Sequence, residues 1–156
     1  IIKSILGNGT MVEGWAVYTE RMMLEEGYGN NQPEMWLMYY KWNLRTTCNA
    51  IIDHEIHCGD MTEEEALDLM INEAFQEEKE ARNKWRRARL TQVQLSSYFT
   101  GFMEIYEFRE EYKHLLGEDF NLKEFHEKFL GYGSAPVKEI RNLMLKELAE
   151  ETLAAN

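Results

Sequence analysis

The sequence contains little proline and little cysteine, and it contains no long apolar run. Pro33 and Pro136 are the only prolines in 156 residues, so few positions interrupt long helices. Cys48 and Cys58 are expected in one helix, where a rise of about 15 Å between them excludes a mutual disulfide. We therefore expect free thiols. No apolar run approaches about 18 residues, so the sequence predicts no membrane-spanning helix.

Basic residues are also scarce, since 17 Lys and Arg stand against 28 Asp and Glu, for a net charge of −11. This balance disfavours nucleic acid and anionic membranes as partners, because both attract Lys and Arg. The local exception is residues 84–89, "KWRRAR". That segment is typical of a basic stripe on a solvated helix. The alternative interpretation is a patch that binds phosphate or carboxylate.

Helical spacing of apolar residues is present almost throughout, and no strand-like alternation persists. Thr62 with Glu65 forms a capping box, and Asn121 is a second helix start. The expected helices cover residues 10–27, 34–58, 62–75, 76–89, 92–116, 122–130 and about 136–153. These features predict an all-α bundle of about six or seven helices, forming a single domain over residues 1–156. We expect Trp15, Trp36, Trp42 and the methionines to lie in its core.

Residues 53–60, "DHEIHCGD", nearly match the zinc-binding pattern HExxH. In that pattern the two histidines lie about 40° apart around the helix, and the Glu reaches the metal-bound water. Here His54 and His57 lie about 60° apart, and Glu55 points about 130° away from their midpoint. A HExxH site is therefore disfavoured. A solvated or core His pair, a two-His structural metal site, and a separate role for His57 stay open.

Residues 12–29, "VEGWAVYTERMMLEEGYG", place Glu13 and Glu20 on one helical face with Ala16 and Val17 between them. A carboxylate among small residues can approach another helix closely, as a metal ligand must. Gly14 costs about 1 kcal/mol of helix stability relative to Ala, which indicates a close backbone approach at that position. The alternative interpretation is two surface glutamates in an acidic protein.

The same segment, "EGWAVYTERMMLEEGYG", resembles the signature of the bacterial "domain of unknown function 885" family. That family is similar to all-helical zinc metallopeptidases of the gluzincin kind. Three later segments resemble further motifs of the family, in the same order: "IIDHEIHCGDMTEEEA", "QLSSYFTG" and "LGEDFNLKEFHEKFLGYGSAPVKEI". The resemblance implies that this chain is the C-terminal portion of a larger helical metallopeptidase-like protein. The chain begins with Ile rather than Met, and we expect a His-Glu zinc helix upstream of it.

The resemblance implies a role in zinc binding for three acidic residues. Glu13 matches the family's third zinc ligand, on a helix separate from the His pair. Glu20 matches the second acid of that motif, and Asp53 matches the Asp of the second segment. Both are expected to hold the zinc ligands in position by hydrogen bonding to them.

The resemblance also implies residues that contact substrate. His57 and Tyr98 are candidates for donating a hydrogen bond to the oxyanion of a tetrahedral intermediate. Arg87, about two turns before the "QLSSYFTG" segment, is a candidate for binding a substrate carboxylate. His126 matches a further His of the family, for which no mechanism follows.

Together these residues predict that the intact protein is a zinc-dependent peptidase or related hydrolase acting on a peptide-like substrate. This chain alone is expected to be inactive and to bind zinc poorly, because one carboxylate does not make a site. Its expected partner is its own N-terminal region, and its expected location is periplasmic or secreted. The alternative function is a non-catalytic helical module that packs on a partner.

Overall fold

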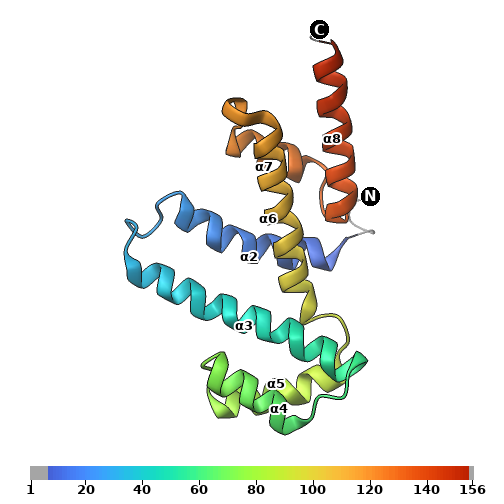
Figure 1. Ribbon diagram of the computed structural model, residues 1–156. Helices are drawn as coiled ribbons and strands as arrows, with labels where there is room; N and C mark the ends of the chain where they lie inside the picture. The colour runs from blue at the N-terminus through green and yellow to red at the C-terminus, as the bar shows by residue number, and fades with distance from the viewer. Residues whose placement is uncertain (1–6, 155–156) are drawn as a thin grey trace.

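The computed structural model describes residues 7–154, and helices account for most of them (Figure 1). No strand occurs in that range, which confirms the all-α prediction. The helices are α2 (Gly9–Glu25), α3 (Pro33–Cys58), α4 (Glu63–Asp68), α5 (Glu78–Leu90), α6 (Ser96–Leu116), α7 (Leu122–Gly131) and α8 (Val137–Ala154). A π-helical turn, η1 (Leu69–Glu73), follows α4, and a 3-10 turn, η2 (Gly117–Asp119), follows α6.

The signals for helix starts are confirmed in the structure. The Thr62 side chain accepts a hydrogen bond from the Glu65 amide, and the Glu65 carboxylate accepts one from the Thr62 amide, which completes the capping box. Asn121 caps α7 through the amide of Glu124. Two boundaries differ from the predicted ones. Phe75 (φ 54°) and Val93 (φ 66°) adopt left-handed backbone conformations, so helices end before both and resume at Glu78 and Ser96.

The buried side chains form two clusters. The first, from α2, α6, α7 and α8, contains Met11, Val17, Tyr18, Phe102, Ile105, Phe108, Tyr112, Phe125, Phe129, Val137, Ile140 and Met144. The second, from α3, α4, η1, α5 and the start of α6, contains Cys48, Ile52, Ala66, Met70, Ala74, Ala81, Trp85, Ala88 and Leu95. Figure 1 shows α6 crossing α2 and α3, with α7 and α8 toward one end and α4 and α5 beyond α3. Helix α6 therefore connects the two clusters.

The expected core positions are only partly confirmed. Trp15 packs against the first cluster with its ring stacked on Phe129 at 5.7 Å between centroids. Trp42, by contrast, is 50% exposed, and Met23 and Met38 are also exposed, so their predicted core location is wrong. For Trp42 and Met38 the reason is that apolar residues occur around most of α3, whereas neighbouring helices cover only part of it.

Both cysteines are free, as predicted, with Cys48 buried and Cys58 exposed. Burial raises the pKa of the Cys48 thiol to about 11, so the thiol stays protonated at neutral pH. Among residues 7–154, no helix combines the length and the apolar character that a membrane crossing requires.

Helices α2 and α6 touch backbone to backbone at two glycines. A Cβ built on Gly14 would lie 2.2 Å from the carbonyl carbon of Gly101, and one built on Gly101 would lie 2.0 Å from the carbonyl oxygen of Thr10. No side chain fits between the two helices at this crossing. The close approach predicted from Gly14 is confirmed.

Replacing Gly14 with Ala should lower the free energy of unfolding by about 3 kcal/mol, because the added methyl group forces the two backbones apart. Urea unfolding followed by far-ultraviolet circular dichroism measures this loss. Gly9→Ala is the matched control, since a Cβ on Gly9 meets nothing within 4 Å. Equal stability of the two variants would contradict the described crossing.

Candidate functional site

A cleft of about 250 Å³ lies where α2, α3, α5 and the start of α6 meet. Its lining brings together three of the predicted site residues, namely Glu20, Arg87 and Tyr98. The other lining residues are Ala16, Val17, Trp42, Arg45, Thr46, Asn49, Lys84 and Leu95. Residues far apart in the sequence thus surround one polar cleft, which makes it the candidate site.

Arg87 and Tyr98 are linked through Gln94. The Arg87 guanidinium donates a hydrogen bond to Gln94 Oε1, and Gln94 Nε2 donates one of 3.3 Å to the Tyr98 hydroxyl oxygen. Because the Tyr98 oxygen accepts from Gln94, its own hydrogen remains available to another acceptor. The arrangement presents a guanidinium and a phenol along the same wall.

Lys84 is the most buried cation of the cleft, at 8% exposure. Its ammonium donates a hydrogen bond of 2.9 Å to Gln76 Oε1. Burial, with a contribution from Arg45, lowers the pKa of Lys84 to about 8. The predicted solvated stripe is therefore corrected at this position, although Arg86 and Arg89 are exposed as expected.

Two further charged side chains, Arg45 and Glu20, line the cleft. Arg45 forms an ion pair with Glu80 of α5, which anchors its guanidinium beside the cleft. Opposite, burial raises the pKa of the Glu20 carboxyl above its ordinary value. Glu20 is consequently easier to protonate than a surface glutamate.

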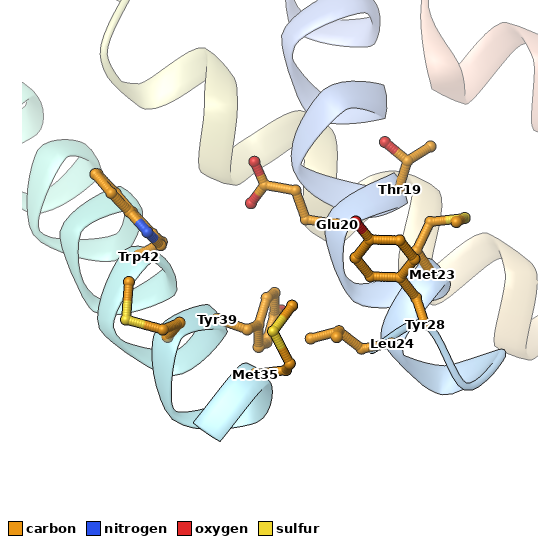
Figure 2. A pocket seen from close by; sticks show the side chains of 9 residues that line it. Thr19, Glu20, Met23, Leu24, Tyr28, Met35, Tyr39 and Trp42 are labelled. Carbon is orange, nitrogen blue, oxygen red and sulfur yellow. The ribbon is translucent and has the colours of Figure 1, made fainter. Parts of the chain in front are cut away.

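A larger and more apolar groove of about 430 Å³ adjoins the cleft, between α2 and α3. Figure 2 shows Met35, Tyr39 and Trp42 on α3, with Glu20 and Leu24 on the α2 side. Glu20 and Trp42 line both hollows. The groove and the cleft therefore meet at these two side chains.

Glu13 lies on α2 about 10 Å along the helix from Glu20 and does not line the cleft. Its side chain is half-buried, and it makes no hydrogen bond or ion pair with residues 7–154. No group of three His, Cys, Asp or Glu side chains within the described range could hold a metal ion. Glu13 thus offers a single carboxylate without a competing partner.

Asp53 and His57 hold the connection between α5 and α6. Asp53 is buried, and its Oδ2 accepts hydrogen bonds from the Ser96 amide (2.9 Å) and hydroxyl (2.7 Å) at the first turn of α6. His57 Nε2 contacts the carbonyl oxygens of Ala88 and Thr91, each at 2.9 Å. Since carbonyls only accept, Nε2 carries the hydrogen. In the described structure both residues position the cleft wall without lining it.

His54 does not join His57 at a shared site. The His54 side chain is exposed, and its Nδ1 contacts Glu55 at 2.9 Å. His57 Nε2 is already occupied by two carbonyl oxygens. These contacts favour the interpretation that the partial HExxH match is accidental.

His126 acquires a structural explanation. Its Nε2 lies 2.7 Å from the hydroxyl of Tyr18, which is fully buried, and its ring meets Trp15 edge-on. Burial and then Arg109 lower the pKa of His126, so the neutral ring accepts from Tyr18. Burial also raises the pKa of Tyr18 to about 12. The pair satisfies two polar groups inside the first cluster.

Arg45 and Asn49 were missed as lining residues in the sequence. Lys84 belongs to the basic segment for which a patch that binds phosphate or carboxylate was the alternative interpretation, and the sequence also carries a signal for its burial. Ala81 and Ala88 lie three residues before and four residues after it, which places Lys84 on the small-residue face that packs inward. No comparable pattern marks Arg45 or Asn49, whose role depends on where α2 and α5 lie.

Residues 2–144 match the sequence model of the family described as "Bacterial protein of unknown function (DUF885)". No curated protein matches the chain. Among solved structures, the chain is similar to "a putative lipoprotein of unknown function" from Shewanella oneidensis, with 72% identity and a TM-score of 0.90 over 92% of this chain and 26% of that one. It is also similar to a "putative lipoprotein" from Colwellia psychrerythraea, with 27% identity and a TM-score of 0.85 over 91% and 24%. This chain thus spans about a quarter of each.

The Tyr18–His126 pair predicts a pH dependence of stability. The folded-state pKa of His126 lies below its ordinary value of 6.5, so protonation favours the unfolded chain. The stabilisation is complete above pH 6.5 and is lost as the pH falls below it. Urea unfolding at pH 7.5 and 5.5 should therefore show a smaller pH effect for His126→Gln, which keeps an acceptor for Tyr18. His114→Gln, at an exposed histidine, should behave like wild type, and a similar response in both variants would disprove the assignment.

Proposed function

Because this chain belongs to the bacterial DUF885 family, whose function is unknown, we propose its function from the site: the intact protein is a zinc-dependent hydrolase of peptide-like substrates. This chain supplies one metal ligand and part of the substrate-binding wall. The observation that carries the proposal is the meeting of Glu20, Arg87 and Tyr98 in one cleft, beside the helix that holds Glu13.

The residues of this chain fit a zinc ion only in part. Among residues 7–154, Glu13 offers a carboxylate with no competing partner, but those residues contain no complete ligand set. The other ligands in the proposal belong to the part of the intact protein outside this chain. Bound zinc would polarise a scissile carbonyl and activate a water molecule.

The cleft residues have separate roles in the proposal. Tyr98 donates its free hydroxyl hydrogen to the developing oxyanion, while Gln94 holds its oxygen in place. Arg87 binds a substrate carboxylate. Glu20, about 10 Å along α2 from Glu13, contacts substrate and not the metal ligand. Asp53 and His57 act by positioning, since they hold the α5–α6 connection from which Arg87, Gln94 and Tyr98 extend.

A second candidate function is a helical module that packs against another part of its own protein. The observation that favours it is an exposed apolar stripe on α3, where Leu37 is 70% exposed and Tyr40 and Leu44 are exposed on the same face. Large exposed apolar patches mark interaction surfaces. The match covers about a quarter of each solved relative, so these relatives contain further polypeptide that could cover the stripe.

The cellular location in the proposal is the bacterial envelope. It is supported by both solved relatives, each of which is named a "putative lipoprotein", and one of them shares 72% of its residues with this chain over the matched region.

The zinc proposal predicts that Glu13→Ala in the intact protein loses most of its bound zinc, because one ligand of the site disappears. Metal content is measured by inductively coupled plasma mass spectrometry after gel filtration. Glu26→Ala, at an exposed glutamate just beyond the same helix, should retain the wild-type zinc content. Unchanged zinc in Glu13→Ala would remove Glu13 from the site.

The packing proposal predicts opposite effects in the fragment and in the intact protein. Replacing Leu37, Tyr40 and Leu44 with Ser should reduce binding of an apolar dye by the 156-residue chain, because exposed apolar area is removed. In the intact protein the same change should lower the melting temperature, since about 1.5–3 kcal/mol per buried side chain is lost. Lys41→Ser on the same helix is the control. An unaltered melting temperature would show that the stripe is not covered.

A further inference from the structure

Two cations of the cleft lack a negatively charged partner. Lys84 and Arg87 donate hydrogen bonds to the side-chain oxygens of Gln76 and Gln94, which are uncharged amides. Neither cation forms an ion pair within residues 7–154. A buried charge is normally paired, because removing it from water costs several kcal/mol. An unpaired ammonium at 8% exposure therefore indicates an anion that the described chain does not supply.

The position of these cations is unusual for this molecule. The whole chain has a net charge of −11, yet Arg45, Lys84 and Arg87 converge on one cleft from α3 and α5. Arg45 is paired with Glu80, and Glu20 is the carboxylate opposite. The charges of Lys84 and Arg87 consequently remain available to a ligand.

Asn49 adds a second polar requirement that a ligand of the cleft has to meet. It lines the same cleft, and its buried side-chain oxygen has no hydrogen-bond donor within the described part of the chain. An unsatisfied buried acceptor destabilises the protein, and a donor on a ligand would recover that loss. A carboxylate has no donor of its own, so the ligand must also carry an N–H or O–H group.

The adjoining groove is lined mainly by apolar side chains, so it favours an apolar group on the ligand. Figure 2 shows the side chains of Leu24, Met35 and Tyr39 around it, and Trp42 stands where it meets the cleft. Methionine side chains adapt to apolar groups of different shape. A ligand that occupies both hollows therefore has an apolar group next to its anionic end.

We propose that the cleft binds the C-terminal carboxylate of a peptide between Lys84 and Arg87, that Asn49 accepts the N–H of its last residue, and that the groove takes an apolar side chain. The proposal gives the substrate class of the proposed hydrolase. Its relevance to catalysis therefore rests on the proposed function. Binding itself requires no metal. A fatty acid would satisfy the cations and the groove but would leave Asn49 without a donor.

The environment of Lys84 makes this binding pH-dependent. The pKa of Lys84 is lowered to about 8, so its charge disappears between pH 7 and 9 in the free protein. Carboxylate binding should weaken over this interval. The ionisable groups around it are Arg45 and Cys48 on α3, Arg87 on α5, Tyr98 on α6, and Glu20 across the cleft on α2.

The test is isothermal titration of the intact protein after metal removal with a chelator. The probes are N-acetyl-leucyl-phenylalanine, the same dipeptide with a C-terminal amide, and decanoate. We expect the free acid to bind at least tenfold more tightly than the amide, and more tightly than decanoate. Equal affinity for acid and amide would overturn the carboxylate site. Tighter binding of decanoate would overturn the peptide assignment in favour of a lipid-like carboxylate.

Matched variants on α5 locate the binding. Arg87→Gln should weaken binding of the free acid by about tenfold or more, because a charge-assisted hydrogen bond is lost. Arg86→Gln, at an exposed arginine outside the cleft, should bind like wild type. Lys84→Met should remove the fall in affinity between pH 7 and 9. Equal losses in Arg87→Gln and Arg86→Gln would show only a nonspecific charge effect and overturn the site.

The design separates this proposal from the zinc proposal. Because the titrations use metal-free protein, the carboxylate can bind when Glu13→Ala leaves the zinc content unchanged. Conversely, a zinc site that depends on Glu13 can be present when the dipeptide does not bind.

Discussion

The contact between the backbones of Gly14 and Gly101 is the constraint on which the geometry of the site depends. It brings α2 against α6 with no side chain between them. Glu13 precedes Gly14 directly, and Glu20 follows it on the same helix, while Tyr98 lies one turn before Gly101. This contact between the two helices therefore fixes the position of the α2 carboxylates relative to the Tyr98 hydroxyl.

A second constraint acts from α3. Asp53 and His57, one turn apart, hold the start of α6 and the end of α5 through charged or polar contacts to backbone groups. A carboxylate at a helix N-terminus and a donor at a helix C-terminus both match the helix dipoles. Between them lies Val93, in a left-handed conformation that costs energy for a β-branched residue. The cleft wall is thus kept in shape by interactions that lie outside the cleft.

Much of the fold could be predicted from sequence because its signals are local. The capping box of Thr62 and Glu65 and the close approach at Gly14 are readable from a few residues. The breaks at Phe75 and Val93 carry no such signal, since neither residue favours a positive φ. The site could be predicted from sequence only in part. The motif resemblance indicated Glu20, Arg87 and Tyr98, whereas the convergence of Arg45 and Lys84 depends on tertiary packing. For Trp42, hydrophobicity indicated burial, but half of its surface stays exposed.

The exposure of Trp42 has a consequence for spectroscopy. Its indole lines the cleft, the apolar groove and a third hollow beside Phe75 and Glu80. Indole emission shifts to shorter wavelength when water leaves its surroundings. Trp15, Trp36 and Trp85 are not among the residues that line these hollows. The fluorescence of Trp42 therefore serves as a built-in reporter of whatever occupies this side of the molecule.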